Sequence, residues 1–133
     1  AAPRLFEKGA YSEAQFRSIQ AGGILRVLQK NRPARAQAYG TMRLIQFNWY
    51  IDHGLLTYED GQLHIHYDKY DAAVESLLEA TLKTQYDGDR DAAVAFTDKW
   101  TTWDGNVHGV IGQSMKDAET ARYRLVTYEA LGE

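Results

Sequence analysis

The sequence predicts a mainly α-helical fold, a compact domain of about five helices with one small β-hairpin over residues 55–67. Apolar residues recur at spacings of three and four in several stretches, as on one face of a helix. Asp60-Gly61 separates two short β-prone runs, which is typical of a hairpin turn. The length of 133 residues and the hydrophobic share of 44% indicate a single globular domain over residues 1–133.

The central element is a helix predicted over residues 35–54. Because its apolar residues form two strips, we expect other elements to surround it. Pro33 before the helix and Gly54 after it suit its two ends. The strips are Ala38, Met42, Ile45 and Trp49 on one face and Leu44, Phe47 and Ile51 on another.

An earlier helix is predicted from the capping box of Ser12 and Gln15 to about Gln29, after an irregular lead-in over residues 1–11. Gly22-Gly23 lies inside it, so either another backbone or a ligand comes close there, or the pair separates two shorter helices. The residues expected to be buried are Phe16, Ile19, Gly23 and Val27, with Ile24 and Leu28 beside them.

Three further helices are predicted after the hairpin. The third begins at Asp68 as N-cap and ends near Gln85, and the fourth begins at Asp89 as N-cap. A short fifth helix covers Val107 to Met115, and residues 122–128 form either a terminal strand or a helix. The inward residues of the fourth helix are Ala92, Ala93, Phe96 and Trp100.

Composition narrows the function classes. A net charge of -3 argues against a nucleic-acid partner, and no apolar run reaches the roughly 20 residues that span a membrane. The absence of Cys excludes disulfides, thiolate zinc sites and cysteine nucleophiles, but it leaves cytoplasmic and periplasmic locations open. Because the first residue is Ala, we expect that an initiator Met, a signal segment or a longer upstream chain precedes it.

Candidate metal ligands are few. His64 and His66 lie on one face of the second predicted strand, and a third ligand would have to come from His108, Asp68 or Glu59. The alternative is a solvated hairpin face with two exposed imidazoles. Neither a His-Glu-x-x-His helix nor a serine in a nucleophile motif is present, so no catalytic or metal-binding residue is assigned.

Tyr39 and Arg43 are the predicted substrate-binding residues. They are four residues apart, so they project from one face of the central helix. A Tyr hydroxyl can donate to an oxyanion, and an Arg guanidinium can hold a carboxylate through two bonds. The alternative is an Arg stacked on a Tyr at the helix surface.

Several stretches in this order resemble the C-terminal part of the dipeptidyl-peptidase III family of zinc peptidases. They are Gly22-Gly-Ile-Leu-Arg-Val-Leu, Gln37-Ala-Tyr-Gly-Thr-Met-Arg43, Ile51-Asp-His-Gly54, Tyr67-Asp-Lys-Tyr70, Thr84-Gln-Tyr-Asp-Gly-Asp89 and Phe96-Thr-Asp-Lys-Trp100. The likeness covers about residues 15–103 and implies the C-terminal part of that family's catalytic lobe. In the family an upstream His-Glu-x-x-(x)-Gly-His helix and a Glu hold the zinc, and neither motif is present here.

The resemblance implies either a fragment or a natural relative stripped of its metal site, and the first residue Ala favours a C-terminal fragment whose zinc-binding part lies upstream. In its full-length form it would be a metallopeptidase that hydrolyses short peptides, and this chain would supply a wall of the cleft and be inactive alone. Arg43 matches the family's substrate-facing Arg, whereas Tyr39 replaces the expected His. The expected partners are the upstream part of the same protein and a short peptide, with zinc as cofactor of the full-length protein only.

Two alternatives remain from the sequence. One is a non-enzymatic helical module that binds a peptide or a protein. The other is a metal-sensing module that uses His64 and His66.

Overall fold

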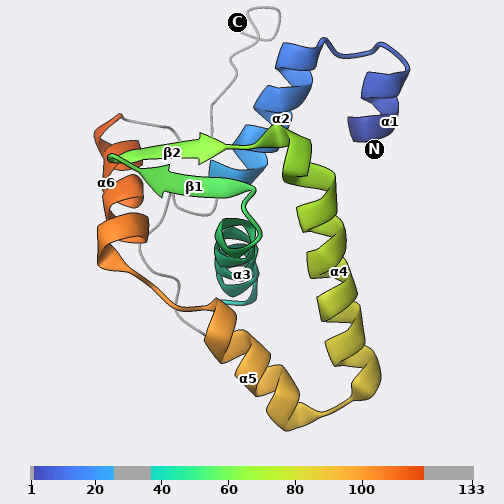
Figure 1. Ribbon diagram of the computed structural model, residues 1–133, viewed down its shortest axis with the longest axis vertical. Helices are drawn as coiled ribbons and strands as arrows, with labels where there is room; N and C mark the ends of the chain where they lie inside the picture. The colour runs from blue at the N-terminus through green and yellow to red at the C-terminus, as the bar shows by residue number, and fades with distance from the viewer. Residues whose placement is uncertain (1, 26–36, 119–133) are drawn as a thin grey trace, which may run out of the picture.

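The computed structural model describes residues 2–25 and 37–118. Within these ranges the chain forms six α-helices and one antiparallel hairpin, which confirms the predicted mainly helical fold class (Figure 1). A short 3₁₀ turn, η1 (Tyr67–Lys69), and a π-helical turn, η2 (Gly105–Gly109), join the later elements. The predicted element over residues 122–128 lies outside the described residues. No helix in the described part is long and apolar enough to cross a membrane.

The first helix was not predicted. Residues assigned to an irregular lead-in contain α1 (Ala2–Glu7), whose Phe6 ring stacks on Phe16 at 4.6 Å between ring centroids. That stacking attaches α1 to α2 (Glu13–Leu25). Pro3 lies in the first turn, where it is tolerated.

The start of α2 is as predicted, but its buried face is different. The Ser12 backbone N–H donates to Gln15 Oε1 at 2.8 Å, and the Gln15 N–H donates to Ser12 Oγ at 3.3 Å, which confirms the capping box. The helix continues through Gly22-Gly23 without a break. The expected burial of Ile19 and Gly23 is wrong, because both are exposed, whereas Ile24 is buried as expected. Residues 26–29 of the predicted helix are outside the described ranges.

The central helix and the hairpin follow their sequence signals. Helix α3 (Ala38–Asp52) ends before Gly54, which has the left-handed φ of +69° expected of a helix-terminating glycine. Strands β1 (Leu56–Glu59) and β2 (Gln62–Ile65) pair with Leu56 opposite Ile65. Asp60 and Gly61 between them have φ values of +51° and +77°, as a type I′ turn requires.

The later helices begin and end close to the predicted positions. Helix α4 (Tyr70–Asp87) begins after η1. The prediction that Asp68 is its N-cap is wrong, because Asp68 lies inside the 3₁₀ turn and Lys69 is the N-cap. Helix α5 (Arg90–Trp100) has the predicted N-cap, since Asp89 Oδ1 accepts from the N–H groups of Asp91 and Ala92 at 2.9 and 3.0 Å. Helix α6 (Val110–Asp117) matches the fifth predicted helix.

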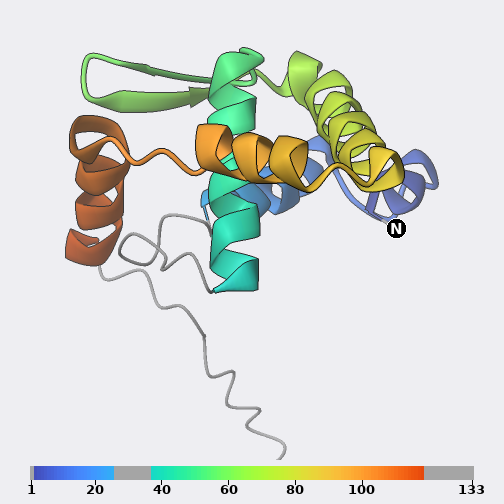
Figure 2. The ribbon, with the colours of Figure 1, turned by 90° about the horizontal axis from the view of Figure 1, so that it is seen from below.

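The elements are arranged around α3. In Figure 1 this helix is seen end-on, with the hairpin above it, α4 to its right and α5 below, and Figure 2 shows α5 running across α3. Phe47, Leu55 and Leu56 have no exposed surface, so the core lies between the second half of α3 and the start of the hairpin. The strip that begins with Ala38 and Met42 is not surrounded as predicted, because Met42 is 48% exposed.

Candidate functional site: an uncharged groove between α3, α4 and α5

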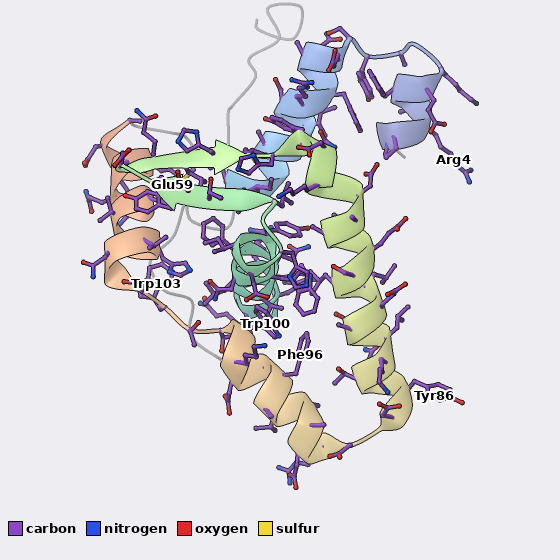
Figure 3. All side chains as sticks on the ribbon, viewed as in Figure 1. Arg4, Glu59, Tyr86, Phe96, Trp100 and Trp103 are labelled. Atoms are coloured by element: carbon purple, nitrogen blue, oxygen red, sulfur yellow. The ribbon has the colours of Figure 1, made fainter. Side chains whose placement is uncertain are left out.

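A groove of about 570 Å³ lies between α3, α4 and α5. Its apolar lining includes Met42 and Ile45 from α3, Leu78 from α4 and Phe96 from α5. In Figure 3 Phe96 points from α5 into the space between α3 and α4. Among the described residues, no Asp, Glu, Lys, Arg or His lines the groove. Its volume is within the usual range for ligand pockets, but it offers no charged group to a ligand.

Three threonines of the groove use their hydroxyl protons within their own helices. The hydroxyl groups of Thr81, Thr84 and Thr97 each donate to the carbonyl oxygen four residues earlier, at 2.8, 2.8 and 2.9 Å. This back-bonding is common for Thr in helix interiors. Since these three donors are engaged, the side-chain donors left to a ligand include those of Gln46, Gln85 and Tyr50.

Tyr50 also lines the groove, and its phenol stays neutral at physiological pH. Burial raises the pKa of Tyr50 to about 12, with a smaller contribution from the neighbouring Tyr70. Tyr50 lines a second, smaller hollow of about 150 Å³ between α2, α3 and α4, together with Gly23 and Tyr70. Neither tyrosine can therefore act as an anionic base near neutral pH.

An aromatic cluster fixes the three helices of the groove to one another. The Trp49 ring lies 4.7 Å from the Trp100 ring and 6.1 Å from the Phe96 ring, measured between centroids. Trp49 Nε1 also donates to Ser76 Oγ at 3.0 Å, which connects α3 to α4. Such ring pairs add stability beyond the area that they bury. The aromatic side chains therefore keep α3, α4 and α5 in fixed positions relative to one another, and this defines the shape of the groove.

A second polar arrangement joins α3 to the segment after α5. Asn48 Nδ2 donates to the carbonyl oxygens of Trp100 and Thr102 at 3.0 and 2.9 Å. With the amide nitrogen used in this way, Asn48 Oδ1 faces His108 Nε2 at 2.7 Å, so His108 Nε2 carries a proton. His108 Nδ1 is then free to accept from the Asp104 N–H at 3.0 Å.

This network holds His108 in its neutral form. Burial lowers the pKa of His108 below the ordinary 6.5, although the Asp104 carbonyl oxygen and carboxylate nearby act in the opposite direction. The ring is stacked on Trp103 at 5.0 Å and tilted against Phe47 at 5.3 Å. Both ring nitrogens are therefore occupied by structural bonds and not available to a substrate.

The predicted substrate-binding residues lie at the edge of this site. Tyr39 and Arg43 are both on α3, but neither lines the groove. Tyr39 is 79% exposed, and Arg43 is partly buried. No finding tests their contact with a peptide, so that role stays a prediction. The structure points instead to the neighbouring positions Met42, Ile45 and Gln46, whose apolar members the sequence assigned to the core.

The imidazoles do not fit a zinc site. His66 Nε2 lies 3.1 Å from Thr57 Oγ1, and His108, which was considered as a third ligand, has both ring nitrogens engaged with Asn48 and Asp104. Over residues 2–25 and 37–118, no group of three or more His, Asp or Glu side chains is placed to hold a metal ion. A metal-sensing role for His64 and His66 therefore has no support in this geometry.

Comparison with known proteins gives one distant similarity. No family model matches the chain, and no solved structure matches it. The chain is similar to Nudix hydrolase 3 of Arabidopsis thaliana, with 28% identity over 102 residues. These residues are 76% of the chain but 13% of the plant protein, so the chain spans a small part of the curated relative's length.

This similarity overturns the family predicted from the sequence. The relative carries the name of a Nudix hydrolase and not that of a dipeptidyl peptidase, so the resemblance to the dipeptidyl-peptidase III family is corrected. The zinc metallopeptidase function that followed from it is corrected as well, and the alternative of a non-enzymatic binding module is not supported. The coarser description as part of a hydrolase is compatible with the similarity. Several of the short motifs that suggested the peptidase family, such as residues 51–54 and 84–89, lie at helix ends and turns, which recur in unrelated helical proteins.

Proposed function

We propose that this chain is a structural segment of a larger hydrolase, and that the face formed by α3, α4 and α5 packs against another part of that polypeptide. The observation that carries the proposal is the groove, which is open, uncharged and lined by side chains such as Met42, Leu78 and Phe96. Apolar surface of this kind favours burial, because its removal from water is the main driving force of association.

The similarity supports the same proposal. The curated relative is a hydrolase by name, and the matched part is 13% of its length. A segment of that size within a large protein meets other parts of the chain on one or more faces. In the described residues the buried imidazole of His108 is used in the Asn48 network, and the Asp89 carboxylate caps α5, so both groups have structural roles.

The first test is the natural reading frame. Sequencing the transcript that encodes this chain should show a reading frame that continues well beyond it and includes a hydrolase region. A transcript that encodes little more than these 133 residues would refute the proposal.

The second test compares the two methionines of the sequence, Met42 in the groove and Met115 on α6. Hydrogen peroxide oxidises accessible Met to the sulfoxide, and mass spectrometry measures the rate at each position. We expect Met42 to be oxidised several-fold more slowly in the larger natural protein than in the isolated chain, with a smaller change at Met115. Equal rates at Met42 in the two proteins would mean that the groove stays open.

A further inference from the structure

We propose that the groove between α3, α4 and α5 binds the aliphatic face of one helix with basic flanks, supplied by the rest of the larger protein. This inference rests on the proposed function, because it names the element that covers the face. It goes further by stating what chemistry that element must have.

The lining selects an aliphatic occupant. Among the described residues the groove has no charged side chain, its lining is largely apolar, and its remaining polar side chains, such as Gln46 and Gln85, are uncharged. A phosphate or carboxylate group would therefore lose its hydration there without meeting an opposite charge. Leucine-like side chains lose nothing of that kind. A helix presents such side chains at positions i, i+3, i+4 and i+7, which is the usual way that an apolar groove between helices is filled.

The net charge of α4 and α5 selects the charge of that helix. Residues 70–100, which contain α4 and α5, carry seven Asp or Glu against three Lys or Arg, a formal charge of −4. Glu75 and Glu79 are exposed on the same helix as the groove residue Leu78, which is itself 55% exposed. The lysine that follows them on α4, Lys83, is paired with Asp87 at 2.7 Å. A helix with Lys or Arg beside its aliphatic face complements the net negative charge of α4 and α5, and an acidic one is repelled.

The test uses three synthetic peptides of about 18 residues, long enough to form a helix. The first has leucines at helical spacing and lysines elsewhere, the second has the same leucines with glutamates, and the third is a scrambled form of the first. Binding of each fluorescent peptide to the 133-residue chain is followed by anisotropy. We expect the lysine helix to bind about tenfold more tightly than the glutamate helix, and the scrambled peptide not to bind.

Matched variants locate the binding. Leu78→Gln should weaken binding of the lysine helix about tenfold, whereas Ile19→Gln, at a similarly exposed leucine-sized residue on α2, should not change it. Glu79→Lys should reduce the preference for the lysine helix, and Glu7→Lys on α1, with the same change of net charge, should leave it unchanged. The melting temperature of each variant shows that the chain is still folded.

Other outcomes overturn the inference in distinct ways. Equal binding of the scrambled peptide, or no effect of Leu78→Gln, would mean non-specific adsorption. Binding of a fluorescent fatty alcohol without binding of the helix would make the groove a small-ligand site. Self-association that Leu78→Gln abolishes, without helix binding, would identify a second copy as the occupant. If the lysine helix does not bind while Met42 is still oxidised more slowly in the larger protein, the proposed function stands and only the inference of a helical occupant is wrong.

Discussion

Replacing Asn48 by Ala should destabilise the chain strongly, because one side chain joins α3 to two later segments. The substitution removes the bonds to the Trp100 and Thr102 carbonyl oxygens, at 3.0 and 2.9 Å, and the bond from His108 Nε2, at 2.7 Å. Each typical hydrogen bond contributes a net amount of about 0.5–1.5 kcal/mol, and a buried group left without a partner costs more. Three such bonds predict a loss of about 1.5–4.5 kcal/mol in the free energy of unfolding.

The measurement is urea unfolding followed by tryptophan fluorescence, since Trp100 and Trp103 lie beside the network. The control is Asn106→Ala, at an exposed residue of η2 whose backbone N–H, at 2.8 Å from Asp104 Oδ1, is unchanged by the substitution. We expect the control to change stability by less than about 0.5 kcal/mol. A loss of under about 0.5 kcal/mol for Asn48→Ala would refute the reasoning, because it would mean that these bonds contribute nothing net in solution.

Three further predictions follow from the local geometry. Burial lowers the pKa of His108, so its contribution to stability is complete above the ordinary pKa of 6.5 and is lost as the pH falls toward the folded-state pKa. Urea unfolding at pH 7.5 and at pH 5 should show this loss of stability. In the His108→Gln variant the difference in stability between the two pH values should be smaller. Gly22→Ala should raise the melting temperature, with a gain of up to about 1 kcal/mol, because nothing lies within 4 Å of the added methyl group; Gly88→Ala, at φ +65°, should lower it. Asp89→Ala should cost about 0.5–2 kcal/mol through loss of the α5 cap, and Asp89→Asn should retain most of that stability in the same thermal assay.

The candidate site shows where sequence reasoning succeeds and fails. Asn48 lies between the aromatic residues Phe47 and Trp49 on the central helix, and a polar residue among buried apolar neighbours indicates a polar contact inside the fold. Its partner His108 lies 60 residues further along the chain, and nothing in its local pattern connects the two. Periodicity also assigned Met42 to the core, because a repeating apolar pattern shows which residues share a face but not whether another element covers that face.

The family assignment failed for a related reason. Short motifs such as Asp87-Gly88-Asp89 carry strong local information, since Gly88 adopts a left-handed φ and Asp89 caps the next helix. A left-handed glycine and an N-cap residue are common wherever a short turn connects two helices. They therefore indicate the local fold and do not identify a family.

The sequence alone determined several local features of this protein: the capping box at Ser12, the turn at Asp60-Gly61 and the cap at Asp89 are arrangements of neighbouring residues, and the structure contains all three. Only the tertiary structure decided which faces are buried, that α1 stacks on α2 through Phe6, and that α3, α4 and α5 leave an uncharged groove between them. The physical reason is that hydrogen bonds within a turn depend on residues a few positions apart. Burial depends on which distant segments come together, and a single sequence does not encode those contacts in any local pattern.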